Sequence, residues 1–375
     1  MSALTAEQRA AATLACLPEM HPGRLNALLR RWGHATTALA AIHAGDGAVI
    51  GCLETPKTGL SAAQRLAARW RAVDPDVVGA RCEQRGTRIW RDHDPGYPIT
   101  RPVPHQPRVL LGEGRQLDML APRRALRVGI VGTRAATPSG RADTERLAAA
   151  LAAAGVVVIS GLAIGVDAAA HRGAIAAGGH TVAVVATGLD IVYPRRHEAL
   201  ARQVLEHGGI LSESGFGVGP EPGRFPVRNR IIAALSDAVV VTEATERGGA
   251  RITAEHALEY GRAVLAQPGS RRNPTAAGCN ALIADGAHPL VRPSDVFMAL
   301  DLDVPAGIDA VWSPDCEPPR TATATTVRTA MADRGASLDE LLETTGLDAA
   351  TLSAQLRSLR ADGGARYERG RWWAT

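Results

Sequence analysis

Lysine, aromatic residues and paired cysteines are scarce in this sequence of 375 residues. Lys57 is the only lysine, so any phosphate site must use guanidinium groups, which bind phosphate oxygens bidentately and stack on bases. Aromatic residues make up 3% of the chain, so its core must be built mainly from Ala, Val, Leu and Ile. No two of the five cysteines have C-x-x-C spacing, which argues against a zinc site or a dithiol redox site, and we expect neither a metal nor a cofactor.

Long apolar runs and a dinucleotide fingerprint are also missing. No segment reaches ~18 uninterrupted apolar residues, and the first residues show no basic stretch followed by an apolar run, so we expect a cytoplasmic protein with no membrane partner. The turn at 129–134 is not G-x-G-x-x-G, which disfavours a NAD-dependent dehydrogenase. The net charge of +4 permits a nucleic-acid partner without requiring one.

The composition changes along the chain in a way that predicts several domains. Residues 1–80 are rich in Ala and Leu at helical spacing, which predicts a small helical domain. From about residue 127, short β-branched runs alternate with Ala-rich helical stretches. This pattern is typical of a parallel sheet covered by helices on both faces, and we place this α/β domain at 81–302. Prolines and threonines at 303–324 predict a linker.

The last part of the chain, 325–375, predicts a winged-helix domain. Ser337-Leu338-Asp339-Glu340 is a capping box that begins one helix, and Asp348 can cap a second. Gly363-Gly364 then leads into an alternating run typical of a hairpin. Two helices followed by a hairpin are the elements of a winged helix-turn-helix.

We expect function at the carboxyl ends of the parallel strands, where ligands bind in open α/β sheets. Two of these strand ends are rich in small residues that let a ligand approach the backbone, and the first also carries an arginine that can bind an anion. The candidates are Gly132, Thr133, Arg134, Ser160, Gly161, Gly165 and Asp167. Each stretch could equally be an ordinary turn, and Asp167 a helix cap. His171 has no partner in its own segment, so we interpret it as structural.

Three further stretches add charge and aromatic rings. Single-strand binding needs neutralised phosphates, stacked bases and contacts to base edges, and an arginine–aromatic–amide combination supplies all three. The candidates are Tyr193, Arg195, Phe225, Arg228, Asn229, Arg230, Gly248 and Gly249. A solvated helix face usually mixes in acids, whereas none lies between Arg224 and Ser236. Composition therefore favours binding for that segment, and an ordinary loop remains the alternative around Tyr193.

These stretches, in this order, resemble the DNA-processing (DprA/Smf) family of bacterial proteins. The matching motifs are Val131-Gly132-Thr133-Arg134, Ser160-Gly161-Leu162-Ala163-Ile164-Gly165-Val166-Asp167, Gly188-Leu189-Asp190 with Tyr193-Pro194, and Phe225-Pro226-Val227-Arg228-Asn229-Arg230. The resemblance implies an extended Rossmann-like domain that binds single-stranded DNA without catalysis, as a homodimer. It also implies a recombination mediator that protects incoming DNA and helps to load RecA during DNA-mediated transformation.

The chain departs from the family pattern at three places. Many members have Ser-Gly-Ser where this chain has Gly248-Gly249-Ala250, which removes two hydroxyls that could contact phosphate. His197 stands where Asn is common. Pro22-Gly23 fits a helix-hairpin-helix turn only loosely, which puts DNA binding by the N-terminal part in question.

The main alternative is a nucleotide phosphoribohydrolase of the lysine-decarboxylase-like (LOG) type. Those enzymes carry Pro-Gly-Gly-x-Gly-Thr-x-x-Glu, and the stretch from Gly248 to Glu255 has the paired glycines, the Thr and the final Glu. It lacks the Pro, and Arg251 occupies the position of the third Gly, where a side chain would block close approach to a phosphate. A transcription regulator that uses only the winged helix is a third possibility.

Overall fold

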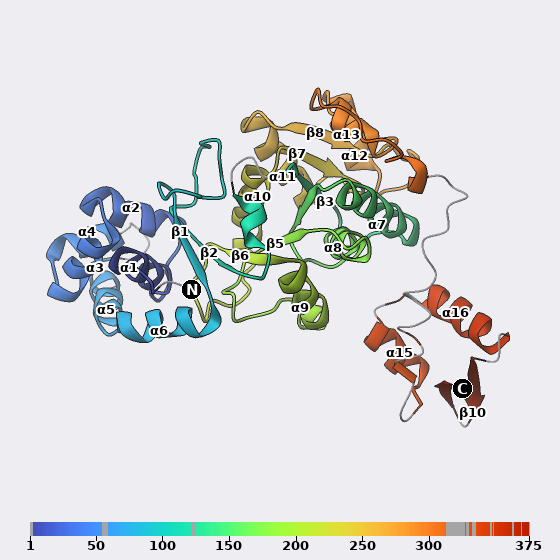
Figure 1. Ribbon diagram of the computed structural model, residues 1–375. Coiled ribbons are helices and arrows are strands. Elements are labelled where there is room, and N and C mark those ends of the chain that lie inside the picture. The colour runs from blue at the N-terminus through green and yellow to red at the C-terminus, as the bar shows by residue number, and fades with distance from the viewer. Residues whose placement is uncertain are drawn as a thin grey trace. The chain divides into compact units, whose positions relative to one another are not determined.

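The chain folds into two compact units, Met1–Asp309 and Ala310–Thr375, which are described separately below. The computed structural model (Figure 1) describes residues 3–54, 59–121, 125–312, 327, 330–331, 335–345, 347, 349–361, 364–368 and 370–374. Residues 313–324 of the predicted linker lie outside this set, as do Asp348 and Gly363 of the predicted tail domain.

The first unit begins with helices that share one apolar core. They are α1 (Ala6–Ala15), α2 (Pro22–Trp32), α3 (Ala35–Ala44), α4 (Gly47–Leu53), α5 (Leu60–Arg71) and α6 (Pro75–Arg85). Their ends follow from local chemistry: Thr5 and Gln8 form a capping box on α1, and proline opens both α2 and α6. Trp70 is fully buried at their centre, and its indole N–H donates to the Pro18 carbonyl at 2.8 Å.

None of the described helices is by itself long and apolar enough to cross a membrane. The pair α3 and α4 passes that test jointly by length and composition, but the chain bends by 109° between them.

Nine strands of the described chain form one sheet, in the order β1-β2-β6-β5-β4-β3-β7-β8-β9. Their bounds are β1 Arg88–Arg91, β2 Val109–Glu113, β3 Arg127–Val131, β4 Val157–Ser160, β5 Thr181–Val185, β6 Gly208–Ser212, β7 Ala238–Val241, β8 Ala263–Ala266 and β9 His288–Pro289. Seven neighbouring strands run parallel to one another: β6, β5, β4, β3, β7, β8 and β9. Strands β1 and β2 extend the sheet in antiparallel pairings at the β6 edge. The predicted α/β class with an extended, mostly parallel sheet is therefore confirmed.

Helices cover both faces of this sheet. They are α7 (Pro138–Ala153), α8 (Val166–Ala176), α9 (Glu198–His207), α10 (Arg224–Leu235), α11 (Gly249–Glu259), α12 (Ala277–Ala284) and α13 (Ser294–Met298). Alternate side chains of β5 separate the two layers. Ala183 and Val185 pack with α8 and α9, whereas Val182 and Val184 join the core that contains α10. The N-terminal helices lie beyond the β1 edge (Figure 1), where Ile89 belongs to their core.

The order of the strands creates a switch point between β3 and β7. The chain steps from β3 through β4 and β5 to β6, and then returns to place β7 on the other side of β3. In open α/β sheets, ligands bind at the carboxyl ends of strands next to such a reversal. The turns after β3 and β7 therefore mark the expected place for a ligand.

The described part of the second unit includes two helices followed by a hairpin, as the sequence predicts. Helices α15 (Leu338–Thr345) and α16 (Ala349–Ala361) precede the antiparallel strands β10 (Ala365–Glu368) and β11 (Arg371–Ala374). An isolated bridge joins Ala336 to Trp372 of β11. These described elements agree with a winged helix, which stays a prediction for this unit.

Candidate nucleic-acid interface

The turns after β3, β4 and β7 are packed directly against one another. The Thr133 N–H donates to the Glu243 carbonyl at 2.7 Å, and the Thr133 carbonyl accepts from the Val166 N–H at 3.3 Å. A Cβ at Gly132 would stand 2.4 Å from Val166, and one at Gly165 would stand 2.3 Å from the Thr133 carbonyl oxygen. Gly165 also has a φ of +83°, which side-chain-bearing residues rarely adopt. These two glycines are therefore required by the packing of the turns.

Three of the predicted residues form one exposed group, here called the aromatic cluster: Arg134, Tyr193 and Phe225. The Arg134 guanidinium carbon lies 4.9 Å from the centre of the Phe225 ring. The Phe225 and Tyr193 ring centres are 5.6 Å apart at an interplanar angle of 49°. Arg134 is exposed, Tyr193 is 42% exposed and Phe225 is half-buried. The three come from separate segments: the turn after β3, the loop after β5 and the start of α10.

Further exposed arginines stand on neighbouring strand-end loops. Arg195 follows the loop after β5, as predicted, and it is exposed. Arg196 and Arg247 were not among the predicted site residues, although each adjoins one that was, Arg195 and Gly248. Within the described part of the chain, none of Arg134, Arg195, Arg196 and Arg247 has an ion-pair partner, so all four charges face solvent.

Arg228, another predicted residue, lies inside the protein instead of at its surface. It is 6% exposed, and its Nη1 donates to the Gly161 carbonyl at 2.7 Å and to the Val184 carbonyl. A Cβ at Gly161 would stand 2.6 Å from both the Arg228 guanidinium and the Asp167 carboxylate. The Asp167 Oδ2 also accepts the Ala163 N–H at 3.3 Å. Arg228 thus links the turn after β4 to the end of β5, and Asp167 holds the same turn through Ala163.

Burial acts on the charges of this internal pair. It lowers the pKa of Arg228 to about 10, and the nearby Asp167 opposes the shift. Burial likewise raises the pKa of Asp167, and Arg228 is the main opposing influence. Each charge therefore opposes the effect of burial on the pKa of the other.

Two other predicted side chains are also occupied by internal partners. Arg230 is 7% exposed and forms an ion pair with Glu213. Burial raises the pKa of Glu213, and Arg230 only partly opposes this shift. Ser160 is fully buried, and its hydroxyl donates to the Ile130 carbonyl at 2.6 Å. Neither side chain can meet a ligand in this conformation.

The remaining predicted residues lie at the start of α11. Gly248 precedes the helix and Gly249 is its first residue, exposed and with no atom near the position of a Cβ. The Asn229 amide donates to the Gly249 carbonyl at 3.1 Å, which ties α10 to this helix start. The structure therefore brings the Gly248-Gly249 turn close to the segment that carries Phe225.

Glu243, a buried carboxylate that follows β7, has surroundings that give it a structural role. It is 7% exposed, and its carboxylate accepts from the Thr137 N–H at 2.8 Å, the Thr137 hydroxyl at 2.7 Å and the Thr275 hydroxyl at 3.1 Å. Three donors from two loops hold this carboxylate in place. It joins the loops after β3, β7 and β8.

His171 is structural, in agreement with the interpretation of the sequence. It is fully buried, and its Nδ1 lies 2.7 Å from the Thr181 hydroxyl. That hydroxyl donates its single proton to the Val158 carbonyl at 2.9 Å, so it must accept from His171. Nδ1 therefore carries the proton of a neutral imidazole. Nε2 is buried with no hydrogen-bond partner among the described residues.

We expect His171→Asn to make the protein less sensitive to acid. Burial, aided by the nearby His197 and Arg228, lowers the pKa of His171 to about 3. The unfolded chain binds this proton near pH 6.5 and the folded protein does not. Stability is therefore fully present above pH 6.5 and is lost as the pH falls toward 3, by up to about 1.4 kcal/mol per pH unit.

The measurement is urea unfolding at pH 7, 6 and 5. Asparagine can keep a donor near Thr181 without a titrating group, so the difference in the free energy of unfolding between pH 7 and pH 5 should shrink in His171→Asn. His288→Asn, at an exposed position of β9, is the control and should keep the wild-type slope. An unchanged slope in His171→Asn would show that this imidazole is protonated without cost in the fold.

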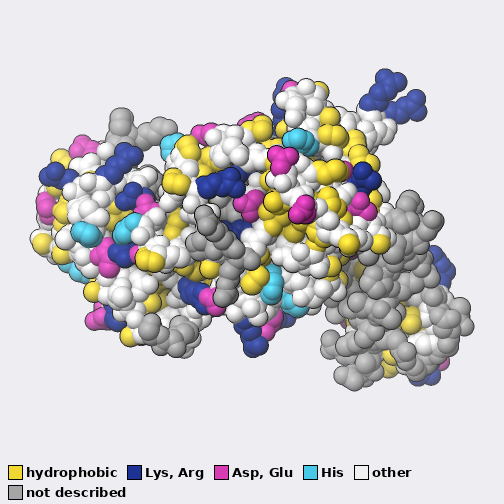
Figure 2. All heavy atoms as spheres, turned by 45° about the horizontal axis from the view of Figure 1, so that its top comes forward, with side chains coloured by type: hydrophobic (Ala, Val, Ile, Leu, Met, Phe, Trp, Pro, Cys, Tyr) yellow, Lys and Arg dark blue, Asp and Glu magenta, His cyan; other side chains and the backbone are white. Residues whose placement is uncertain are grey.

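The face seen in Figure 2 shows no dominant charge. Basic, acidic and apolar side chains are interspersed on it, in keeping with a net charge of only +4. Among the described residues, no three His, Cys, Asp or Glu side chains gather in a way that could hold a metal ion. The strand-end loops offer arginines and backbone amides, both of which can bind an anionic ligand.

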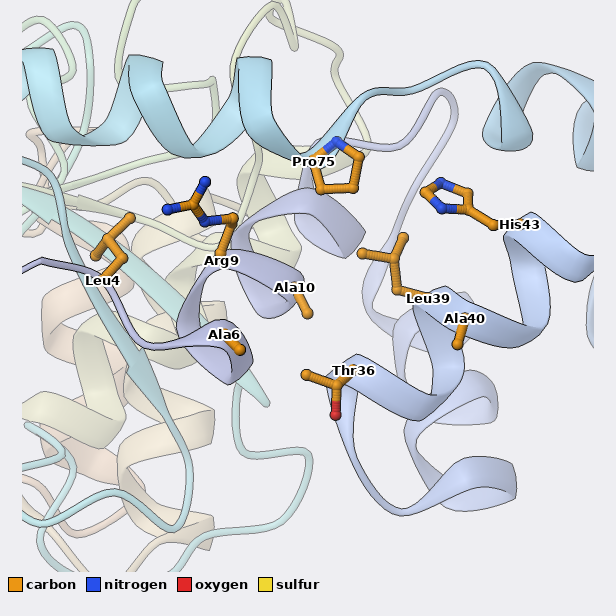
Figure 3. A pocket seen from close by; sticks show the side chains of 9 residues that line it. All are labelled: Leu4, Ala6, Arg9, Ala10, Thr36, Leu39, Ala40, His43 and Pro75. Carbon is orange, nitrogen blue, oxygen red and sulfur yellow. The ribbon is translucent and has the colours of Figure 1, made fainter.

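An open groove of about 520 Å³ lies elsewhere, among the N-terminal helices (Figure 3). Its wall is mainly apolar, and Arg9 at its edge pairs with Asp76 at 2.7 Å. The lining residues are Leu4, Ala6, Arg9, Ala10, Thr36, Leu39, Ala40, His43 and Pro75. None of the predicted binding residues takes part in it, so the strand-end loops remain the candidate site.

Comparison with known proteins covers the same part of the chain. The family model of DNA recombination-mediator protein A matches residues 88–301, a range that contains every predicted binding residue. A DNA processing protein DprA of Mycobacterium tuberculosis is 38% identical over 313 residues, which cover 77% of each chain.

Two solved structures are similar as well. The X-ray structure of DNA processing protein A from Streptococcus pneumoniae has a TM-score of 0.64 at 29% identity, and the match covers 79% of this chain and 98% of that one. A structure of DNA processing protein A from Helicobacter pylori, described for its mode of binding single-stranded DNA, has a TM-score of 0.50 at 28% identity and covers 58% and 97% of the two chains.

Proposed function

Because the chain belongs to the DNA recombination-mediator protein A (DprA/Smf) family, we propose that it binds single-stranded DNA at the carboxyl edge of its parallel sheet. The observation that carries the proposal is the aromatic cluster. An exposed tyrosine, a half-buried phenylalanine and an exposed arginine converge from three separate segments. Bases of any sequence can stack on such rings, and the guanidinium can hold the adjoining phosphate.

The proposed binding surface divides the predicted residues into two groups. The first group lies at the surface and contacts the single-stranded DNA. It consists of Arg134, Arg195, Tyr193 and Phe225, joined by the exposed Arg196 and Arg247. The backbone N–H of Gly249, at the positive end of α11, is offered to a phosphate, whereas the Gly248 N–H donates to the Thr245 carbonyl at 3.1 Å. The internal group, Ser160, Gly161, Asp167, Arg228 and Arg230, shapes the loops from within.

The proposed function is binding without catalysis. The phosphoribohydrolase alternative needs a glycine at the position of Arg251, whose guanidinium lies 3.5 Å from Asp285 in an ion pair. The Glu of that motif is the exposed Glu255, so the departure at Arg251 is what argues against the alternative. The buried Glu243 is held by three hydrogen bonds and does not face a substrate. Membership of a recombination-mediator family favours a protein that delivers DNA to another factor.

The family resemblance extends the proposal to partners. We infer that the protein acts in the cytoplasm as a homodimer, protects incoming single strands and helps to load RecA during DNA-mediated transformation. Weak dependence on sequence suits this role, because incoming DNA has no fixed sequence. Base stacking and phosphate contacts, the two interactions that the surface offers, are both tolerant of sequence.

Fluorescence anisotropy with labelled single-stranded and duplex oligonucleotides of equal length tests the proposal. We expect strong preference for the single strand and similar affinity for different sequences. If each of the four exposed arginines neutralises one phosphate, log K should fall with log salt with a slope of about −3, because each contact to a single strand contributes about 0.7. Equal affinity for duplex, or no binding to either, would overturn the proposal.

A further inference from the structure

The loops that carry the aromatic cluster are held from one side by the N-terminal helices. The Arg81 guanidinium of α6 lies 2.9 Å from the Asp190 carboxylate, in the loop between β5 and Tyr193. Arg85, one turn further along α6, binds both oxygens of Glu113 at 2.8 Å and donates to the Leu189 carbonyl at 3.2 Å. Helix α6 thus contacts the loop after β5 at two successive residues.

The same two arginines enclose Phe216, which follows β6. Their guanidinium carbons lie 4.7 Å (Arg81) and 5.8 Å (Arg85) from the centre of its ring. The Phe216 N–H donates to the Cys16 sulfur at 3.3 Å, and a Cβ at Gly215 would stand 2.4 Å from the Ala15 carbonyl oxygen. The loop after β6 is therefore pressed against the end of α1 and belongs to the core of the N-terminal helices.

Asp190 joins these contacts to one another. Both of its carboxylate oxygens accept the Gly217 N–H, at 3.0 Å each, while one pairs with Arg81. The Gly188 N–H donates to the Val218 carbonyl at 2.9 Å, a second link between the loops after β5 and β6. Asp190 is three residues before Tyr193, so its position limits where the Tyr193 ring can lie.

We propose that Arg81 is a positioning residue for DNA binding: through Asp190, the N-terminal helices hold the loop after β5 so that Tyr193 stays against Phe225. The helices need not touch DNA to take part in binding it. The inference rests on the proposed function, since it explains how one part of that binding surface is kept in place. Without Arg81, Asp190 keeps only the Gly217 N–H, and the loop can sample positions in which the two rings separate.

The test uses the full chain and compares Arg81→Met with Arg81→Lys. Arg81→Met should weaken binding of a single-stranded oligonucleotide by about 3- to 10-fold, a range typical of residues that act on a site through another residue. Lysine keeps the charge opposite Asp190 and should restore most of the affinity. Arg69→Met is the matched control, because Arg69 also forms an exposed ion pair, with Glu19 at 2.6 Å on the N-terminal helices, and should bind as wild type.

A second readout separates positioning from a general loss of charge or fold. An oligonucleotide containing 2-aminopurine reports stacking as quenched fluorescence, and at saturating protein Arg81→Met should show less quenching than wild type. Asp190→Asn should reproduce this signature, and the double variant should be no worse than either single variant, because both changes break the same contact.

Several results would overturn the inference. One is an Arg81→Met variant that matches wild type in both affinity and quenching. Another is an equal loss of affinity in Arg69→Met. Additive losses in the double variant would likewise refute it. Failure of the wild-type chain to bind a single strand is a different result, since it would refute the proposed function itself.

Discussion

Replacing Phe225 by alanine should weaken binding of single-stranded DNA by about 5- to 150-fold, because stacking of a base on an aromatic side chain contributes about 1–3 kcal/mol. The ring is the centre of the aromatic cluster, with Arg134 at 4.9 Å on one side and Tyr193 at 5.6 Å on the other. Its loss removes a stacking surface and also the support on which the Arg134 guanidinium rests. No other single side chain of the cluster contacts both of the remaining members.

Anisotropy titrations at several salt concentrations measure this effect. Because Phe225→Ala removes no charge, the affinity should fall while the dependence on salt stays close to that of wild type. Val227→Ala is the matched control: Val227 lies two residues further along α10, is 41% exposed, and offers apolar surface without a ring. An affinity of Phe225→Ala within twofold of wild type would show that bases do not stack on this ring.

The sequence was sufficient to predict the sheet and the edge at which the candidate residues gather. Near-continuous β-branched runs are typical of parallel strands buried on both faces, and the carboxyl ends of such strands share one edge. The convergence of Arg134, Tyr193 and Phe225 follows from that rule, although 91 residues separate the first from the last. The sequence could predict this grouping because the topology of a parallel sheet does not depend on details of packing.

The sequence could not distinguish which arginines of α10 face solvent. Arg224, Arg228 and Arg230 look alike in the sequence, yet only the first is partly exposed. The partners of the other two are the Gly161 and Val184 carbonyls and Glu213, which lie on different strand ends. One signal was available: an apolar run from Ile231 to Leu235 covers all sides of the helix, which is typical of a buried helix.

Docking of the N-terminal helices was equally hidden. Their core includes Ile89, Val109 and Leu111 of the antiparallel strands β1 and β2, together with Phe216. Periodicity predicts each helix from its own residues, but it carries no information about a surface far away in the sequence. For the same reason, no local pattern pointed to Arg81 as a partner of Asp190 across 109 positions.

Arg228→Ala is expected to cost about 3–5 kcal/mol of folding free energy, since it leaves the buried Asp167 without its main opposing charge and two buried carbonyls without their donor. Arg228 supplies the charge that opposes the burial of Asp167, and it donates to two carbonyls that lie at the ends of different strands. Urea unfolding measures the loss. Arg224→Ala on the same helix is the control. Arg224 pairs with the exposed Glu221 at 3.0 Å, and breaking such a surface pair costs about 1 kcal/mol or less.

Neutralising Asp167 at the same time should recover part of this loss. In Arg228→Met with Asp167→Asn, no unpaired charge is buried, and the asparagine oxygen can still accept the Ala163 N–H. Recovery should be incomplete, because the Gly161 and Val184 carbonyls stay without their donor. A double variant no more stable than Arg228→Met would show that the lost hydrogen bonds, and not the unpaired charge, dominate. The double variant should also bind single-stranded DNA more weakly than wild type at equal folding, because Arg228 links the turn after β4 to the end of β5 without meeting the DNA itself.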